Sequence, residues 1–205
     1  MQKIEHFNKS HFILQFLKQK TKGGLPPPLL TNKQNKTMSN FQIYVGTYGK
    51  YNDGNLFGKW IDVGNLSNDE FTETIELLHS DEDDPEFMYQ DFDVPDSFRS
   101  LIEESFISND FWALKDWYNE QSQTQQMAFD AFVYLGHDPN PEQFEEAYVG
   151  EYASGAEYAE QLADELGELR NVPDYITNCI DWQHVWDSYL RYDFEEVNGY
   201  FFRNY

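Results

Sequence analysis

The stretch from His79 to Asp96, HSDEDDPEFMYQDFDVPD, constrains more than any other how this chain can fold. Eight of its eighteen residues are Asp or Glu and none is Lys or Arg. Large apolar residues nevertheless lie among these acids, namely Phe87, Met88, Tyr89 and Phe92. A disordered acidic segment would lack them, because disorder goes with high net charge and few aromatic residues. The stretch therefore predicts a folded segment that keeps a dense row of carboxylates in water.

The rest of the chain repeats this combination of acidity and aromatic content. Its 205 residues carry a formal net charge of -23, yet 18% of them are aromatic, which is enough apolar area for a core. Residues 1–37 hold seven Lys and one acid, so seven basic residues face 36 acids in residues 38–205, a formal net charge of -29 there. Such self-repulsion opposes compaction. Because this surface would repel nucleic acid and anionic lipid, we expect a strongly basic protein partner and no membrane contact.

Residues 1–37 differ in composition from the rest and contain the linker-like run GGLPPPLLTNKQNKT. We expect translation to begin at Met38; the alternative is a genuine basic, flexible extension that folds back on the acidic body. No stretch approaches the roughly 18 consecutive apolar residues of a membrane span, and His11–Leu17 lacks a clean signal-peptide cleavage site. The single cysteine, Cys179, excludes an intrachain disulfide and fits a reducing, cytoplasmic location.

Residues 40–96 predict a small antiparallel sheet with one helix. Alternating apolar residues place strands at Phe41–Thr47, about 55–63 and about 86–92, with Asn52-Asp53-Gly54 as the turn between the first two. Ser67 and Glu70 have the spacing of a capping box, in which each side chain satisfies an amide at the helix start. We therefore expect a helix from about residue 68 to residue 79, with its apolar face formed by Phe71, Ile75 and Leu78.

The remaining residues predict mainly helices. Apolar residues recur at helical spacing through 97–138, which indicates short helices packed together. In 139–205, Asn140-Pro141 is a helix start, Ser154 and Glu157 form a second capping box, and 181–190 predict another helix. A C-terminal strand at 199–205 is expected to pair with residues near 192–194. The predicted fold class is therefore α+β, with three small domains at 40–96, 97–138 and 139–205.

The spacing of acids on the predicted helices points to a function. Glu157, Glu160, Asp164 and Glu168 follow at steps of three and four residues, so they would form one ridge with carboxylates about 4.5–6 Å apart along the axis. A predicted helix at 142–151 adds further acids in the same way. Like-charge neighbours cost a few tenths of a kcal/mol each. A solvated helix face explains any single acid, but 36 acids against seven bases exceed what solubility needs.

Duplex DNA offers a natural comparison for this charge density. It carries about one negative charge per 1.7 Å of axis, counting both strands. Carboxylate ridges on several connected surfaces approach that density, so such a protein could occupy a DNA-binding channel without any reactive group. Two alternatives stay open: an acidic binding module for another basic DNA-binding protein, such as a nucleoid protein, and a small hydrolase that uses an acidic pair.

The chain resembles the ArdA family of antirestriction proteins, which bacterial plasmids, transposons and phages encode. The resemblance rests on IYVGTYGKYNDGNLFGKWIDV at 43–63, DEDDPEFMYQDFDVP at 81–95, EEAYVGEYASGAEYAEQLADELG at 145–167 and VPDYITNCIDWQHVWDSYL at 172–190. It implies an elongated, curved protein of three small domains, dimeric through its C-terminal part. It also implies mimicry of B-form DNA, inhibition of type I restriction–modification enzymes through the methyltransferase core, and a cytoplasmic location in bacteria.

The resemblance places the family's antirestriction segment at about 169–190, next to the dimer contact. Here Cys179 and Trp186 stand where the family tends to have tyrosine and arginine. The residues expected at the dimer contact are Tyr175, Ile176, Ile180, Asp181, Trp182 and Trp186. The acids expected to contact the partner in place of phosphates are Asp81, Glu82, Asp83, Asp84, Glu86, Asp91, Asp93, Glu103, Glu104, Asp110, Glu142, Glu145, Glu146, Glu151, Glu157, Glu160, Asp164, Glu165 and Glu168.

Other chemistry receives little support from the sequence. The Asp81–Asp84 run lacks the glycine that an EF-hand calcium loop requires, and acidic pairs of the kind glycosidases use carry no specificity in so acidic a chain. His79, His137 and His184 lack metal-ligand spacing, and we expect them to be packing or surface residues. Cys179 has no sequence-near histidine in a catalytic pattern and is expected to be buried. We therefore expect no enzyme activity, no cofactor and no specific metal site.

Overall fold

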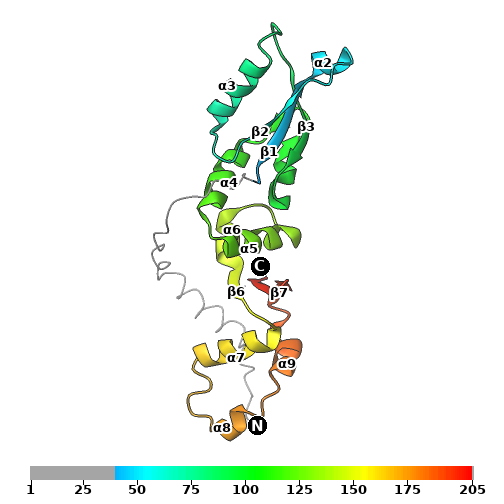
Figure 1. Cartoon of the computed structure of the whole chain (residues 1–205). Helices are drawn as coiled ribbons and strands as arrows, with labels where there is room; N and C mark the ends of the chain where they lie inside the picture. Colours follow the sequence, from blue (N-terminus) through cyan, green and yellow to red (C-terminus); the bar gives the residue numbers. More distant parts are fainter. Residues whose placement is uncertain (1–39, 205) are drawn as a thin grey trace, which may run out of the picture. The chain divides into compact units, whose positions relative to one another are not determined.

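The structure is a computed structural model that describes residues 40–204 (Figure 1). These residues all belong to one compact unit, Met38–Tyr205. The predictions made for residues 1–37 lie outside the described residues. Helices and short antiparallel sheets alternate along the unit, which confirms the predicted α+β class.

Three antiparallel strands form the first sheet, in the order β2-β1-β3. They are β1 (Gln42–Thr47), β2 (Lys59–Asp62) and β3 (Phe87–Asp93). Ile43 of β1 pairs with Ile61 of β2 and with Phe92 of β3, so these apolar side chains share one face of the sheet. The first and third predicted strands are confirmed to within a residue.

Helix α3 (Asn68–Leu78) runs along this sheet (Figure 1). Its predicted capping box is confirmed: the Ser67 side chain accepts from the Glu70 amide, and the Glu70 carboxylate accepts from the Ser67 amide. Phe71 and Ile75 are buried against the sheet, whereas Leu78 is only half-buried. The local signals in the sequence thus locate the helix correctly and overestimate the width of its buried face.

The first two strands pair as predicted, but the predicted connection between them is wrong. A short helix, α2 (Tyr48–Asn52), follows β1 directly, because the Thr47 side chain caps it by accepting from the Lys50 amide. The second strand consequently begins at residue 59 and not near residue 55. Gly54 does take the positive φ expected of a turn, at 75°.

The central residues form short helices, as predicted. A 3₁₀ helix η1 (Asp96–Leu101) leads into α4 (Asn109–Glu120) and α5 (Gln123–Tyr134). Between η1 and α4 lies a hairpin that was not predicted, formed by β4 (Ile102–Glu103) and β5 (Phe106–Ile107). Strands of two residues are too short to show alternation, so no periodic pattern announces them.

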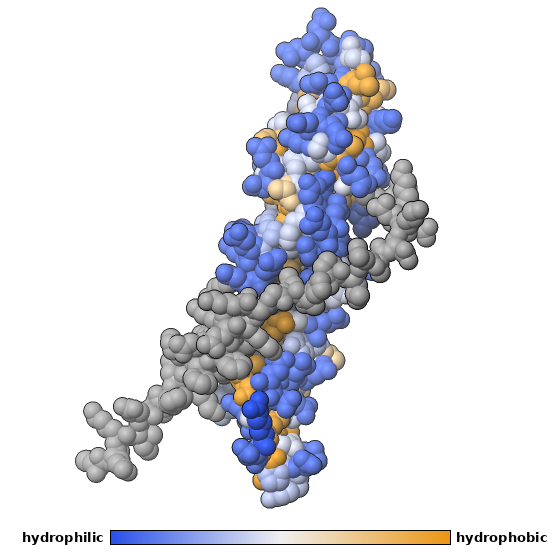
Figure 2. Space-filling model, turned by 90° about the vertical axis from the view of Figure 1, so that its left-hand side faces the viewer, coloured by the Kyte–Doolittle hydropathy of each residue, from blue (hydrophilic) through white to orange (hydrophobic). Residues whose placement is uncertain are grey.

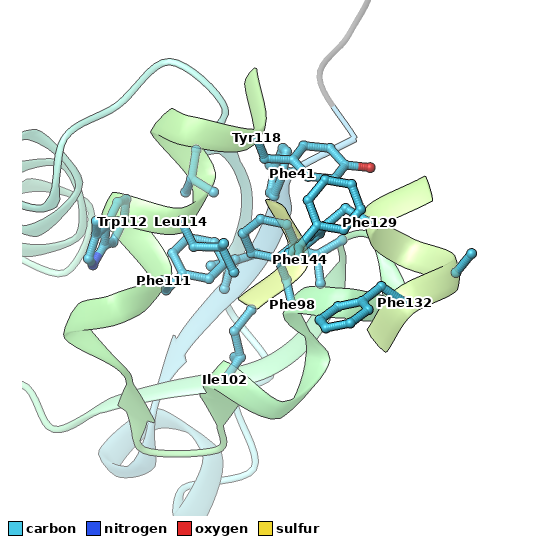
Figure 3. Packing of buried hydrophobic residues seen from close by; sticks show 14 of the residues in the cluster. Phe41, Phe98, Ile102, Phe111, Trp112, Leu114, Tyr118, Phe129, Phe132 and Phe144 are labelled. Carbon is cyan, nitrogen blue, oxygen red and sulfur yellow. The ribbon is translucent and has the colours of Figure 1, made fainter. Parts of the chain in front are cut away.

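An aromatic cluster joins these elements (Figure 3). The Phe41 and Phe98 rings lie 4.8 Å apart at 88°, and Phe98 and Phe111 lie 5.6 Å apart at 79°, both edge-to-face arrangements that aromatic rings favour. The cluster continues through Phe129 to Phe144 of the next predicted segment, with ring centroids 5.4 Å apart. Side chains from all three predicted domains therefore share one buried cluster, and the boundaries between those domains stay a prediction.

The C-terminal residues combine helices with a second three-stranded sheet, in the order β6-β8-β7. Its strands are β6 (Tyr148–Glu151), β7 (Phe194–Val197) and β8 (Tyr200–Arg203). The helices are α6 (Pro141–Ala147), α7 (Gly155–Glu165), α8 (Asp174–Thr177), α9 (Trp182–Val185) and the π-helix η2 (Trp186–Leu190). The expected pairing of the C-terminal strand with residues near Phe194 is confirmed.

Two helix predictions in this part need correction. The helix that begins at Pro141 ends at Ala147, not at residue 151, because the chain enters β6 and pairs with β8. At the start of α7, the Ser154 side chain accepts from the Glu157 amide as expected, but the Glu157 carboxylate accepts from Ala153 at 2.6 Å. Only half of the second predicted capping box therefore forms.

Candidate acidic binding surface

Most of the carboxylates of the described chain reach the surface. Among the acids of residues 40–204, all are exposed except Glu82, Asp130 and Glu195. Asp130 accepts hydrogen bonds from Ser97 at 2.5 Å and from Tyr118 at 2.9 Å, and Glu195 contacts His137 at 2.8 Å. Figure 2 shows hydrophilic residues over most of the coloured surface on the face in view.

The cations are distributed differently, because two of the seven Lys and Arg side chains in residues 40–204 are buried. Lys115 of α4 donates to the Leu66 carbonyl at 2.6 Å, contacts Asp116 at 3.0 Å and lies 5.6 Å from the centre of the Trp112 ring. Its ammonium group thus serves to join α4 to the loop before α3. Lys115 is therefore withdrawn from contact with a partner, although its charge offsets that of exposed Asp116.

Lys50 of α2 is the second buried cation and lies at the start of the acidic run. Its Nζ lies 2.7 Å from Asp81 and 3.1 Å from Glu82, and 3.0 Å from Nδ1 of the fully buried His79. The Thr47 hydroxyl donates to Glu82 at 2.8 Å. This arrangement joins the end of β1 to the residues that follow α3, across about thirty residues of sequence.

The electrostatics of this group follow from its contacts. The hydrogen bond from Lys50 lowers the pKa of Asp81. Burial alone would raise the pKa of Glu82, but hydrogen bonds from Thr47 and Lys50 outweigh burial and lower it. Burial likewise opposes the charge on Lys50, yet the two carboxylates raise its pKa. Burial and the nearby ammonium lower the pKa of His79, so its neutral ring can accept at Nδ1 and donate from Nε2 toward the Val45 carbonyl.

His79, Asp81 and Glu82 of this group are also residues of the types that bind metal ions. His79, Asp81 and Glu82 present ligand atoms within 4.8 Å of one another, which by residue type could hold an ion. The Lys50 ammonium already lies among those atoms, at 2.7–3.1 Å from each of the three side chains. A built-in cation thus takes the role that a metal would have there.

The acids predicted to contact a partner are exposed with the single exception of half-buried Glu82. On α7, Glu160 and Asp164 stand one turn apart on the exposed side, opposite the buried Ala159 and Leu162, as the ridge prediction required. Glu157 is also exposed, although its carboxylate is used at the helix start. Glu168, by contrast, lies beyond the end of α7 at Glu165 and does not continue the ridge by helical geometry.

The other predicted acids occur on several kinds of element. Glu142, Glu145 and Glu146 lie on the exposed side of α6, while Glu151 ends strand β6 and is no part of that helix. Glu103 and Glu104 belong to the β4-β5 hairpin. Glu165 is the exposed last residue of α7 and accepts from Gln161 at 3.4 Å. The remaining predicted acids lie before or on β3 or near the start of α4, namely Asp83, Asp84, Glu86, Asp91, Asp93 and Asp110.

The residues predicted at a dimer contact fall into two groups. Tyr175 is 73% exposed and Ile176 is 43% exposed, both on α8. Trp182 and Trp186 are half-buried against the chain's own second core, where the Trp186 and Phe201 rings lie 5.3 Å apart. Ile180 is half-buried, and Asp181 caps α9 by accepting from the His184 amide at 3.0 Å. Cys179, expected to be buried, is exposed.

These features define the class of protein. It is an α+β protein whose exposed surface is rich in carboxylates and in which two of the seven Lys and Arg side chains of residues 40–204 are buried. No helix of residues 40–204 is long and apolar enough to cross a membrane. The chain belongs to the ArdA family of antirestriction proteins, since the family model described as "Antirestriction protein (ArdA)" matches residues 43–202. The family relation implies an antirestriction role and interaction with restriction–modification enzymes. A comparison with curated proteins finds no match.

Sequence reasoning missed the internal use of Lys50 and Lys115. Neither lies in a motif, and their acceptors are distant in the sequence or are backbone carbonyls. The one usable signal is that apolar or aromatic residues lie within two positions of each lysine, namely Tyr48 and Tyr51 or Leu114 and Trp117. The signal is weak, because Lys59 precedes Trp60 and Ile61 and is exposed. A lysine in such a setting is a candidate for a buried, paired cation.

Proposed function

We propose that the protein is a non-catalytic decoy that enters the DNA-binding groove of type I restriction–modification enzymes. Its carboxylates stand in for the phosphates of B-form DNA. The observation that carries this proposal is the separation of charge: all the acids predicted to contact a partner except half-buried Glu82 are exposed, whereas Lys50 and Lys115 are withdrawn from the surface. Together with the family relation, this favours a basic DNA-binding groove as the partner.

Charge, and not a reactive group, is the proposed basis of inhibition. A groove that binds DNA gains affinity by neutralising phosphates and releasing counterions. Exposed carboxylates at one-turn spacing on α7 and α6 offer the same groove an anionic partner that presents no scissile phosphodiester. We propose that this binding occurs in the bacterial cytoplasm and that it uses the methyltransferase core.

A second element of the proposal is a homodimer formed through α8 and its neighbours. Tyr175 and Ile176 expose large apolar area, and Tyr189 and Tyr192 are 69% and 70% exposed nearby in the sequence. A contiguous exposed apolar patch marks a protein-binding site, and these residues are the candidates for one here. Sedimentation of wild type and of Tyr175→Ala/Ile176→Ala measures this: the dimer proposal predicts that the double variant sediments as a monomer at concentrations where wild type is dimeric.

The experiment for the decoy is a competition for DNA. Purified protein should displace fluorescent duplex DNA from a type I methyltransferase core, and the inhibition should weaken steeply as salt rises, because ion release contributes to it. Neutralising acids in increasing number should weaken the inhibition gradually. A single substitution that abolished it at once would indicate an enzyme, and binding to a nucleoid protein without any DNA displacement would indicate the acidic binding module.

A further inference from the structure

The outer face of the first sheet carries a row of side chains that the acidic surface does not explain. Tyr44 of β1 pairs directly with Trp60 of β2 and with Asp91 of β3. Residues paired across neighbouring strands point to the same side of a sheet. Tyr44, Trp60 and Asp91 therefore stand side by side on the face away from Ile43, Val45 and α3.

This face is hollowed. A depression of about 720 Å³ is lined by the row together with Tyr51 of α2, Met88 of β3 and Glu104 of the β4-β5 hairpin. It is an open depression and not an enclosed cavity, so it suits a side chain that enters from the surface of another protein. Among the described residues that line it, none is Lys or Arg. The Arg99 guanidinium lies 6.0 Å from the centre of the Phe92 ring at one wall, and no Lys or Arg of residues 40–204 lies over the ring of Tyr44, Tyr51 or Trp60.

The walls of the hollow are held in place. The Tyr44 and Trp60 rings lie 5.6 Å apart at 69°, and the Tyr44 hydroxyl donates to the Leu56 carbonyl at 3.2 Å. Gly58 lets the intervening loop close over the Tyr44 ring, because a Cβ there would lie 2.5 Å from that ring and 2.7 Å from the Val45 carbonyl. The site is thus shaped before any ligand arrives.

The acidic rim is fixed in the same way. The Asp91 carboxylate accepts from the Phe92 amide at 2.9 Å, and the Tyr89 amide donates to the Glu104 carbonyl at 2.7 Å, which ties the hairpin to β3. Large apolar side chains remain exposed around the hollow: Tyr51 is 49% and Trp60 is 42% exposed. Apolar area of this kind on so charged a surface marks a place for a partner.

We propose that this hollow, formed by Tyr44, Tyr51, Trp60, Met88, Asp91 and Glu104, binds an arginine side chain of the partner protein. A cation over an aromatic face is attracted by the ring, and guanidinium is planar, weakly hydrated and able to stack on rings while it donates to carboxylates. Lysine is more strongly hydrated and lacks the planar fork. The identity of the partner rests on the proposed function, since DNA-binding grooves are rich in arginine.

This site adds what carboxylates alone do not provide. Exposed charges contribute little each and are screened by salt. The hollow instead offers one side chain aromatic rings and two carboxylates together, and stacking on rings does not depend on unscreened charge alone. The hollow therefore supplies a contact that salt weakens less than it weakens the rest of the surface.

The first experiment uses the whole chain and small probes. Capped, glycine-flanked peptides carrying arginine, lysine or uncharged citrulline are titrated into ¹⁵N-labelled protein, and the indole signal of Trp60 is followed by NMR. The arginine peptide should shift this signal saturably, the lysine peptide at least about threefold more weakly, and citrulline not at all. Equal shifts from arginine and lysine, spread over residues far from the hollow, would overturn the proposal.

Variants separate the hollow from general acidity. Trp60→Ala removes the indole signal, so its titration is followed through the backbone amide signals of Gln90 and Asp91 in the hollow. It should weaken arginine binding about fivefold or more, whereas Tyr134→Ala, which removes an aromatic residue 79% exposed on α5, should not change it. Asp91→Asn should weaken binding, and Glu73→Gln, an equal change of charge on α3, should not. The Asp91→Asn variant keeps a side-chain oxygen for the Phe92 amide, so it tests the site even if Trp60→Ala disturbs the sheet.

A competition assay then connects the hollow to the enzyme. Trp60→Ala leaves the net charge unchanged, yet it should weaken displacement of DNA from the methyltransferase core about fivefold, and Tyr134→Ala should not. Competition by Trp60→Ala equal to that of wild type would overturn the role of the hollow at the partner. If wild type displaced no DNA while the peptide titration succeeded, the decoy function would fail and the arginine site would stand.

Discussion

The Asp81–Asp84 run and helix α7 are both rich in carboxylates, but an internal cation lies against only one of them. Asp81 and Glu82 hold the Lys50 ammonium at 2.7 and 3.1 Å. On α7, neither Glu160 nor Asp164 forms an ion pair with a Lys or Arg of residues 40–204. One region uses part of its acidity to hold the fold together, and the other presents its acidity to solvent.

The difference shows that acid density in a sequence does not measure the charge available to a partner. At the run, removal of charge should act mainly on stability, because the carboxylates satisfy a buried amine. At Glu160 and Asp164 of α7, removal of charge should act mainly on binding, because these neighbouring exposed carboxylates repel one another and form no ion pair with a Lys or Arg of residues 40–204. Four measurements test this contrast, from the largest expected effect to the smallest.

The substitution Lys50→Met should cause the largest loss of stability. It leaves Glu82 and fully buried His79 without their shared donor, and unpaired buried polar groups are costly. We expect the free energy of unfolding to fall by about 2–3 kcal/mol, less than for a fully buried pair because Asp81 stays exposed. Urea denaturation followed by circular dichroism measures this. Lys59→Met, which removes an exposed lysine of β2, is the control, and an equal loss there would contradict the prediction.

Two double variants with the same change of charge should affect different properties, one the competition with DNA and the other the stability of the fold. Glu160→Gln/Asp164→Asn should weaken competition with DNA about fivefold, since each exposed charge contributes up to about 1 kcal/mol, and should leave folding intact. Asp81→Asn/Glu82→Gln should reduce stability more than it reduces competition at temperatures where it remains folded. Thermal denaturation and DNA displacement are measured on both double variants. Equal losses of thermal stability and equal losses of competition in the two variants would remove the distinction between the two regions.

Lowering the pH should weaken the fold through His79. Burial and the Lys50 charge hold the pKa of His79 below its ordinary value of 6.5, so the unfolded chain binds the proton first. Stability is therefore full above about pH 6.5, and it falls from there down to the lowered pKa of the folded state. The pKa values of Asp81 and Glu82 are also lowered, so their contribution is lost only in a more acidic window, below ordinary values of 3.8 and 4.5.

The measurement compares wild type with His79→Asn by urea denaturation between about pH 7.5 and about pH 5.5. The difference in the free energy of unfolding between wild type and His79→Asn should shrink as the pH falls, because only wild type loses stability by protonation of this ring. A difference that stays constant over this range would show that His79 does not titrate there. His137→Asn serves as a control at a half-buried histidine that contacts Glu195.

The smallest effect is expected on α7, where a single neutralisation should stabilise the protein. Glu160→Gln removes one like-charge neighbour of Asp164 at the spacing of one helical turn. We expect the free energy of unfolding to rise by about 0.3 kcal/mol at low ionic strength, and this gain should disappear at high salt. A loss of stability in the same chemical denaturation experiment would mean that Glu160 takes part in the fold.

Local signals predicted much of the fold because they act over a few residues. The capping box at Ser67 and the N-cap at Asn140 place two helix starts correctly, and the alternation in β1 and β3 locates two strands. The failures share a physical origin. Helix α2 has a local N-cap at Thr47, but five residues are too few for a stable helix alone, and distant contacts of Lys50 hold it. The early end of α6 depends on the pairing of β6 with β8.

The candidate site was predictable in kind but not in arrangement. Exposure of the acids on α6 and α7 follows from the apolar residues that must be buried on the opposite side of each helix. The burial of Lys115 and the row of Tyr44, Trp60 and Asp91 depend on strand register and on neighbours far along the chain. No pattern within a single segment specifies which two distant side chains will meet.

The sequence by itself determined that this chain is acidic, that it can bury an aromatic core, and where several helices begin. Net charge, hydrophobic content and capping are properties of single residues or close neighbours. Only the tertiary structure decided which carboxylates are taken up by an internal ammonium and which remain at the surface. It also decided that the outer face of the first sheet is hollow. These outcomes depend on distances between residues that the chain brings together only when it folds, so charge counting alone cannot assign them.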